Sequence, residues 1–145
     1  MSEQGYQAPD LQLVGAEHVR RYRETNGEVG SVWNGVPALL LTTTGRKTGE
    51  PRTNALIFGR DGDDYLVVAS MGGAPHHPSW YLNLSANPSA EIQVRADRIT
   101  VTARTTDEAE KPRLWKIMTN VWPNYDVYQS RTDRVIPLVV LTLAP

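Results

Sequence analysis

Apolar and polar side chains alternate along two neighbouring stretches of the chain, with the period of two that is typical of β-strands. A turn at Ala96-Asp97 would join the two stretches. Val94 then pairs with Ile99, and Ile92 pairs with Val101, so that both apolar sets lie on one face. The pattern therefore predicts a β-hairpin at this position.

Four further segments have the apolar and β-branched composition of strands. Asp61-Gly62 lies between two of them and suits the positive φ angles of a tight turn. The segment after this turn is apolar on both faces, which is typical of a central strand. The predicted strands are 38–44, 52–58, 65–70 and 136–143, and with the hairpin they make six.

Apolar residues recur at helical spacing between these strands. In the first such segment, Asp10 is the expected N-cap and Gly27 the expected stop. Pro112 is compatible only with the first turn of a helix, so it marks the start of the helix that carries Leu114 and Met118 on one side. The predicted helices are 10–27, 79–86, 112–121 and a short one within 122–131.

Six mostly antiparallel strands with short helices between them predict a mainly β (α+β) fold, a small barrel with helical decoration. Residues 1–9 are predicted to form a flexible tail. The remaining residues, 10–145, are expected to form one domain, because a chain of 145 residues can build a single hydrophobic core.

Composition excludes several classes of site and partner. The chain has no cysteine, which excludes disulfides, thiolate metal sites and a cysteine nucleophile. Its 15 basic and 16 acidic residues give a net charge of −1, which argues against a nucleic-acid-binding protein. The N-terminus lacks the pattern of a signal peptide and the apolar runs are strand-sized, so we expect a cytoplasmic location.

One short turn concentrates positive charge in this nearly neutral chain. Residues 45–52, with the sequence GRKTGEPR, contain Arg46, Lys47 and Arg52 against the single acid Glu50. The two glycines allow backbone N–H groups to turn inward, and a basic turn of this kind can cradle an anion. A solvated hairpin tip is the alternative interpretation, since charged turns are common.

Residues 69–75, with the sequence ASMGGAP, follow a predicted buried strand. Small residues and glycines there allow a planar ring to lie against the backbone, although the segment also reads as an ordinary connection. His76 and His77 are adjacent and point apart, so we expect no metal site.

Two aromatic groups complete the candidate site. Trp80 and Asn83 lie on one face of the predicted helix 79–86, where the amide of Asn83 could orient a ring. Trp122, Tyr125 and Tyr128 recur every three residues, which fits either a core face or a partly open wall for a flat hydrophobic substrate.

These motifs together resemble the deazaflavin-dependent nitroreductase family of actinobacteria, which are coenzyme F420-dependent reductases with a split β-barrel fold. The resemblance extends over nearly everything after residue 35. It is carried by residues 41–52 (LTTTGRKTGEPR), 67–75 (VVASMGGAP), 77–84 (HPSWYLNL) and 125–132 (YDVYQSRT), together with Asn87-Pro88 and Ile136-Pro137.

The resemblance implies residue roles in an F420 site. The cofactor-binding set it implies is Arg46, Lys47, Thr48, Arg52, Thr53, Asn54, Ala55, Leu56, Ile57, Val68, Ala69, Ser70, Met71, Ser79, Trp80, Tyr81, Asn83 and Tyr125. Within it, the basic residues match positions that hold the phosphate and oligoglutamate tail. Tyr125, Tyr128 and Ser70 are the implied catalytic residues, with one tyrosine as a proton donor.

The implied reaction is hydride transfer from the reduced deazaflavin to an activated C=C bond, a quinone or a nitroaromatic compound, all small hydrophobic substrates. Two residues depart from the family pattern: Met71 replaces a basic residue near the tail, and Trp122 replaces a third tyrosine. Two alternatives stay open, an FMN-binding split-barrel oxidoreductase and a non-catalytic F420 carrier.

The predicted N-terminal helix also has two interpretations. Its apolar stripe and the cations Arg20, Arg21 and Arg23 could contact the inner face of a membrane peripherally. A lid over the substrate mouth is favoured, because the stripe is short and the mean hydropathy of the segment is low.

Overall fold

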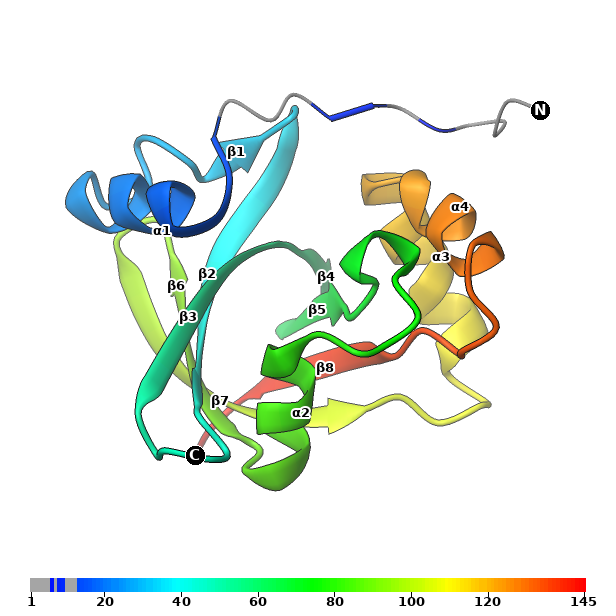
Figure 1. Cartoon of the computed structure of the whole chain (residues 1–145). Helices are drawn as coiled ribbons and strands as arrows, with labels where there is room; N and C mark the ends of the chain where they lie inside the picture. Colours follow the sequence, from blue (N-terminus) through cyan, green and yellow to red (C-terminus); the bar gives the residue numbers. More distant parts are fainter. Residues whose placement is uncertain (1–5, 7, 10–12) are drawn as a thin grey trace.

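The sheet of this protein curls on itself into a partly open barrel (Figure 1). The computed structural model describes residues 6, 8–9 and 13–145. All strand pairs in the described chain are antiparallel, in the order β1-β2-β6-β7-β8-β5-β4, and β3 pairs with β2. The strands are β1 Val32–Trp33, β2 Val36–Thr44, β3 Pro51–Ile57, β4 Gly59–Asp61, β5 Asp64–Val68, β6 Ser89–Val94, β7 Asp97–Thr105 and β8 Leu138–Leu143.

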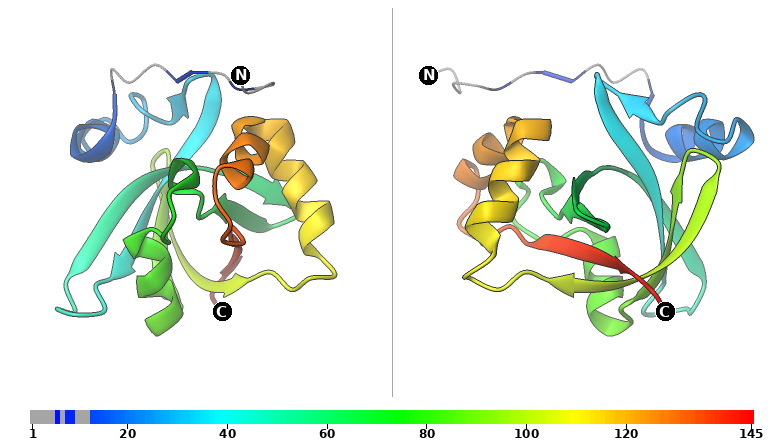
Figure 2. Two further views of the ribbon diagram at one scale, coloured as in Figure 1. Left: turned by 45° about the vertical axis from the view of Figure 1, so that its right-hand side comes forward. Right: turned by 180° about the vertical axis from the view of Figure 1, so that it is seen from behind.

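Helices surround the curled sheet on several sides. They are α1 Gly15–Glu24, the single 3₁₀ turn η1 Met71–Gly73, α2 Ser79–Ala86, α3 Lys111–Val121 and α4 Asn124–Ser130. Figure 2 shows α3 and α4 together on one side of the barrel and α1 on the other. α1 contacts β3, α3 contacts β4 and β5, and α4 contacts η1, so the helices bracket the region between β3 and β5.

Strand β5 separates two hydrophobic clusters. Tyr65 and Val67 face the interior of the barrel, where they join residues of β2, β6 and β7. Leu66 and Val68 face the opposite way and pack with residues of α3, α4 and β8. The prediction of a central strand that is apolar on both faces is confirmed, although this strand ends at Val68 rather than Ser70.

The predicted hairpin forms, but its predicted register is wrong. Ile92 pairs with Ile99 rather than Val101, and Val94 pairs with Asp97. The turn is Arg95-Ala96, with Arg95 at φ +55°, instead of Ala96-Asp97. The partners are displaced by two residues, so each apolar side chain keeps its predicted face.

Contacts from α1 and from the segment that follows it hold the turn at Arg95. The Arg95 N–H donates to the Tyr22 hydroxyl over 2.8 Å, and the Arg95 guanidinium donates to Ser31 Oγ over 3.0 Å. The Tyr22 hydroxyl in turn donates to the carbonyl oxygens of Ala38 and Gln93. Local pairing preferences did not reveal these long-range partners.

The remaining boundaries follow the predictions with a few differences. Helix α2 has the predicted bounds, α3 begins at Lys111, one residue before its predicted start, and α4 lies within the predicted segment 122–131. The short strands β1 and β4 were not predicted, so the described chain has eight strands rather than six. The final strand begins at Leu138 rather than Ile136.

The first helix is shorter than predicted. Helix α1 begins at Gly15 and ends at Glu24, and the proposed cap Asp10 lies outside the described residues. Gly27 ends the turn after the helix, with φ +80° and its N–H bonded to the Tyr22 carbonyl.

Candidate functional site

A cavity of about 540 Å³ opens between β3 and β5. Strand β3 supplies one wall, and the end of β5 with η1 supplies the opposite wall, while α1 and α4 close the sides. Most of the lining is apolar or aromatic, as is typical of a pocket for a flat organic ligand. The lining residues are Val14, Gly15, His18, Trp33, Ala38, Asn54, Ala55, Leu56, Ile57, Val68, Ser70, Met71, Gly72, Pro78, Ser79, Trp80, Trp122, Tyr125 and Tyr128.

A second, more polar hollow of about 460 Å³ adjoins the first. Asn54, Ser79 and Trp80 line both, so the two spaces share a wall. The other residues of this hollow are Gly45, Arg46, Lys47, Thr48, Arg52, Thr53 and Asn83. The predicted basic turn therefore lies at one end of the aromatic cavity.

Backbone hydrogen bonds close the basic turn between β2 and β3. The N–H of Gly45 donates to the Glu50 carbonyl, and the N–H of Gly49 donates to the Gly45 carbonyl, each over 2.8 Å. Gly49 has φ +77°, a conformation that favours glycine. The turn leaves Lys47 exposed, and the carboxylate of Glu50 lies 3.9 Å from Arg52. The positive charge of the turn is thus largely available to a ligand.

Asn83 fixes Arg46 within this turn. The buried Oδ1 of Asn83 accepts from the Arg46 backbone N–H over 3.2 Å and from its guanidinium over 2.9 Å. The Asn83 Nδ2 donates to Thr43 Oγ1 over 3.1 Å. Asn83 therefore lines the polar hollow and is bonded to the turn. The sequence suggests a different role for its amide, the orientation of a ring.

The aromatic stripe at α4 lines the cavity. The rings of Tyr125 and Tyr128 meet edge to face with centroids 6.1 Å apart. Burial raises the pKa of the Tyr125 phenol well above its usual range, and Tyr128 adds to the shift. No hydrogen bond within the described chain engages the Tyr125 hydroxyl. The neutral phenol is therefore free to donate to a ligand.

Tyr128 has a different environment from Tyr125. Its hydroxyl accepts from Trp122 Nε1 and from Asn124 Nδ2, each over 3.4 Å. The ring of Trp122 also lies 5.8 Å from that of Trp33, with the two ring planes inclined by 50°, and both indoles line the cavity.

Two residues of the implied cofactor-binding set line neither space. Ala69 is fully buried in the core of the barrel. The hydroxyl of Tyr81 bonds to Thr105 over 2.9 Å, and this residue lines a separate hollow of about 230 Å³ beside β7. The remaining members of the set lie around the cavity and the polar hollow.

His18 and His77 are each held by contacts with other residues of the protein. The Nε2–H of His18 donates to the Gly30 carbonyl over 2.8 Å, and its buried ring lines the cavity. The ring of His77 contacts Arg134 and Tyr81, and burial and the Arg134 charge lower its pKa. No cluster of metal-ligating side chains occurs in residues 6, 8–9 and 13–145.

Sequence reasoning missed several cavity residues. His18, Trp33 and Ala38 line the cavity but belong to no motif. Trp33 lies in a two-residue strand, and its Nε1–H donates to the Leu13 carbonyl over 2.7 Å. The contact between α1 and β3 brings the first helix to the site.

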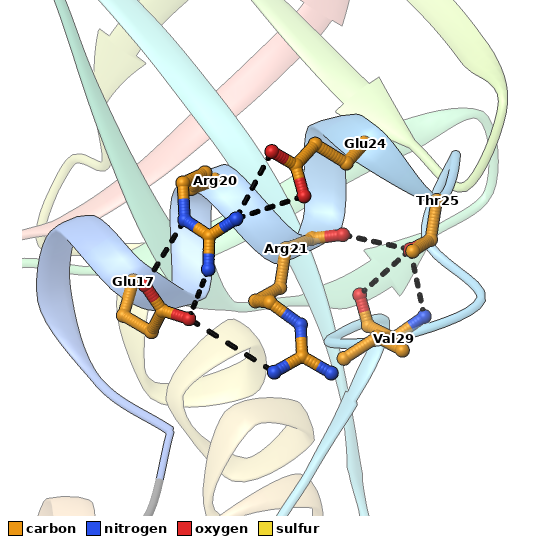
Figure 3. A network of polar contacts seen from close by, with 6 residues as sticks. All are labelled: Glu17, Arg20, Arg21, Glu24, Thr25 and Val29. Atoms are coloured by element: carbon orange, nitrogen blue, oxygen red, sulfur yellow. Dashed lines mark hydrogen bonds and ion pairs between the residues drawn. The ribbon is translucent and has the colours of Figure 1, made fainter.

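The outer face of α1 carries a charge network (Figure 3). Arg20 bridges Glu17 and Glu24, and Arg21 lies 3.9 Å from Glu17. Arg23 donates to Thr53 of β3 over 2.7 Å. The cations of this helix thus have partners on the protein. None of the described helices is long and apolar enough to cross a bilayer.

Comparison with known proteins gives a consistent result. A family model described as F420H(2)-dependent quinone reductase matches residues 14–143. An F420H(2)-dependent quinone reductase of Mycobacterium tuberculosis is 51% identical over 129 residues, which cover 86% of this chain and 87% of that protein.

Solved structures agree with the sequence comparisons. An F420-H2 dependent reductase, FDR-A, has a TM-score of 0.68 at 40% identity and covers 72% of this chain and 93% of its own. A domain-swapped dimer has a TM-score of 0.71 at 36% identity, covering 85% and 96%. The split-barrel fold is thereby confirmed.

Proposed function

The chain belongs to the F420H(2)-dependent quinone reductase family, and from this premise we propose that it reduces quinones in the cavity between β3 and β5. It is an F420-dependent oxidoreductase, so the FMN-based alternative is set aside. When bound, coenzyme F420 supplies a hydride from its reduced deazaflavin ring.

One observation carries the proposal: the aromatic cavity and the basic hollow share the wall of Asn54, Ser79 and Trp80. A coenzyme with a planar ring and a long anionic tail needs two such spaces side by side. The ring fits the space lined by β3 and β5, and the tail fits the basic turn. The residues present therefore suit this coenzyme.

The basic turn holds the tail in this proposal. Lys47 and Arg52 are exposed cations that can pair with phosphate and carboxylate groups, and Arg46 is aimed by Asn83. Thr48 and Thr53 add hydroxyls to the same hollow. Because the tail is remote from the reacting ring, these contacts position the ring without taking part in chemistry.

The ring is proposed to lie against the backbone of β3 and β5. Asn54, Ala55, Leu56 and Ile57 form one side, and Val68, Ser70 and Met71 form the other. Trp80 of α2 closes the end next to the basic turn. The apolar walls exclude water from the reacting atoms, which strengthens the local electrostatics.

The tyrosines at α4 are proposed to face the acceptor. A hydride added to a quinone leaves negative charge on a carbonyl oxygen, and a nearby proton donor stabilises it. The raised pKa keeps Tyr125 protonated, and its hydroxyl has no partner in the described chain. Tyr125 is therefore the first choice as donor, with Tyr128 and Ser70 beside it.

Quinones are favoured over bulky nitroaromatics because of the wall of Trp33 and Trp122. A planar ring can stack on an indole, and both indoles line the cavity. Helix α1 is proposed to act as a lid, since Val14, Gly15 and His18 contribute to the cavity while its cations pair with the protein itself.

The test is oxidation of the reduced coenzyme by the full-length protein with a soluble quinone, an enone and a nitroimidazole as acceptors. We expect one coenzyme oxidised for each quinone reduced, and slower turnover of the nitroimidazole. Tight coenzyme binding without turnover of any acceptor would instead identify a carrier.

A further inference from the structure

Arg134, in the segment between α4 and β8, contacts the cavity wall from behind. It does not line the cavity, yet its guanidinium donates to three backbone carbonyls of residues 69–74. The acceptors are Ala74 over 2.7 Å, Ala69 over 3.2 Å and Ser70 over 2.7 Å. A fourth contact, 3.0 Å long, joins it to His77 Nδ1.

The segment that Arg134 holds has an uncommon backbone. Met71 has φ +46°, followed by Gly72 at +65° and Gly73 at +86°. Such a conformation is costly for a methionine and persists only when its surroundings enforce it. Ser70, Met71 and Gly72 all line the cavity, so the shape of this wall depends on the contacts behind it.

The backbone carbonyls from Ala69 to Gly72 are all engaged. Besides the three that Arg134 holds, the Met71 carbonyl accepts from the Ala74 N–H, and the Gly72 carbonyl accepts from Arg131. In contrast, the N–H groups of Met71 and Gly72 donate to no acceptor within the described chain. The backbone of the wall therefore has donors left for a ligand, and each of its carbonyls between Ala69 and Gly72 already has a donor.

We propose that Arg134 is a positioning residue that turns the carbonyls of residues 69–74 away from the cavity, so that the wall meets its ligand with hydrogen-bond donors. Such a wall favours a ligand that presents an electron-rich carbonyl or enolate oxygen. This inference rests on the proposed function. The oxygen belongs either to the coenzyme ring or to the quinone.

Arginine suits this position for geometric reasons. Its planar fork offers five N–H donors in fixed directions and stays charged, so one side chain reaches several carbonyls at once. A lysine has three donors on a flexible stem and cannot span the same set. The unpartnered phenol of Tyr125, buried in the same cavity, adds a further donor to that surface.

The test compares Arg134→Met with wild type and with Arg60→Met. Arg60 is a suitable control because it also donates to backbone carbonyls, of Gly62 and Asp64, but in the β4–β5 turn away from the cavity. Dissociation constants are measured for oxidised and for reduced coenzyme F420, together with the KM and kcat for a soluble quinone.

Donors favour the more electron-rich form of a ligand. For Arg134→Met we therefore expect a loss of about tenfold in affinity for the reduced coenzyme and about threefold for the oxidised form. If the oxygen that the wall binds belongs to the quinone, the dissociation constants of both coenzyme forms stay unchanged and the kcat for the quinone falls instead. Equal losses for both forms, or changes matched by Arg60→Met, would overturn the proposal.

A second measurement on the wild-type protein covers the case in which Arg134→Met does not fold. Addition of coenzyme, or of coenzyme with quinone, should slow hydrogen exchange of the Met71 and Gly72 amides and shift their resonances. Unchanged amides in a complex that has formed would overturn the inference and leave the proposed function standing. A wild-type protein that binds no coenzyme would refute the proposed function itself.

Discussion

Asn83 shows how one buried side chain links the core to the binding surface. It is 3% exposed, and its amide bonds to Thr43 on one side and to Arg46 on the other. Removing the amide leaves the Arg46 N–H and the Thr43 hydroxyl without this partner. The loss of the amide therefore affects ligand binding as well as stability, because Arg46 belongs to the basic turn.

We expect Asn83→Ala to lower the free energy of unfolding by about 1–3 kcal/mol and also to weaken coenzyme binding. Urea denaturation and a coenzyme titration measure the two effects. Asn87→Ala is the control, since this residue is exposed and its side chain accepts from the Ser89 N–H just after the C-terminal end of the helix. An Asn83 variant with normal coenzyme affinity would contradict the role assigned to this residue.

Tyr125 provides a pH-dependent prediction. Its pKa is raised in the folded state, so the folded protein holds the phenolic proton more tightly than the unfolded chain does. This difference stabilises the folded protein to its full extent at pH values below the unfolded pKa, about 10, and the stabilisation is lost as the pH rises above that value. The free energy of unfolding of the wild type should thus fall more steeply above pH ~10 than that of Tyr125→Phe. Parallel curves would rule out this explanation.

At the residue scale, the sequence predicted the charged residues of the site better than the side chains that hold its walls in place. The excess of Arg46, Lys47 and Arg52 is visible along the chain, and the structure places all three around one hollow. Arg134 was missed because its partners are backbone carbonyls about 60 residues away, which no composition or spacing reveals. The same holds for His18 and its Gly30 partner.

At the scale of elements, helix α1 is tied to the barrel as well as to the cavity. Tyr22 is fully buried, and its hydroxyl bonds to groups of β2, β6 and the β6–β7 turn. Since these contacts also set the hairpin register, a helix read from the sequence as a lid is in addition part of the core. No local pattern along the chain indicates these contacts, because the partners lie as far away as Arg95.

We expect Tyr22→Phe to destabilise the fold by about 1–3 kcal/mol, because the Arg95 N–H and two carbonyls lose a buried partner. Tyr81→Phe removes a hydroxyl whose hydrogen bond to Thr105 is exposed to solvent. This change should alter the free energy of unfolding by less than about 0.5 kcal/mol. Urea denaturation of both variants measures the difference. Equal effects would show that the Tyr22 hydroxyl does not hold α1 in place.

The contact between η1 and α4 depends on Gly73. This residue has φ +86°, and a Cβ there would lie 2.6 Å from the Tyr128 carbonyl oxygen and 2.9 Å from Arg131 Cβ. Gly73→Ala should therefore cost about 3 kcal/mol or more. Gly62→Ala, at φ +62° with nothing within 4 Å of the new atom, should cost only about 1 kcal/mol. Thermal unfolding compares the two, and similar costs would show that the space around Gly73 can relax.

Strand pairing illustrates what local patterns leave undetermined. Alternation predicted the faces of β6 and β7 correctly, since a displacement of two residues preserves the face of each side chain. The register itself depends on Arg95 and its partners Tyr22 and Ser31. The two-residue strand β1 and the three-residue strand β4 are too short to carry a periodic signal.

At the scale of the molecule, the site exists only in the folded chain. Its walls come from α1, β3, β5, η1, α2 and α4, which span the sequence from Val14 to Tyr128. The curled sheet brings these elements together around one cavity. The basic turn joins β2 and β3 next to it (Figure 1). From the sequence, only the resemblance to a known family united these motifs in a single site.

The central claim is that the basic turn anchors the anionic tail of the coenzyme and thereby aims the ring. Its most direct test is a titration of reduced and oxidised coenzyme F420 against wild type, Lys47→Ala and Arg52→Ala at low and high salt, with Arg98→Ala on the β6–β7 hairpin as control. We predict a loss of about 1–3 kcal/mol of binding free energy for each turn variant, smaller at high salt, and none for the control. Coenzyme affinity that is unchanged after neutralisation of the turn would contradict the account.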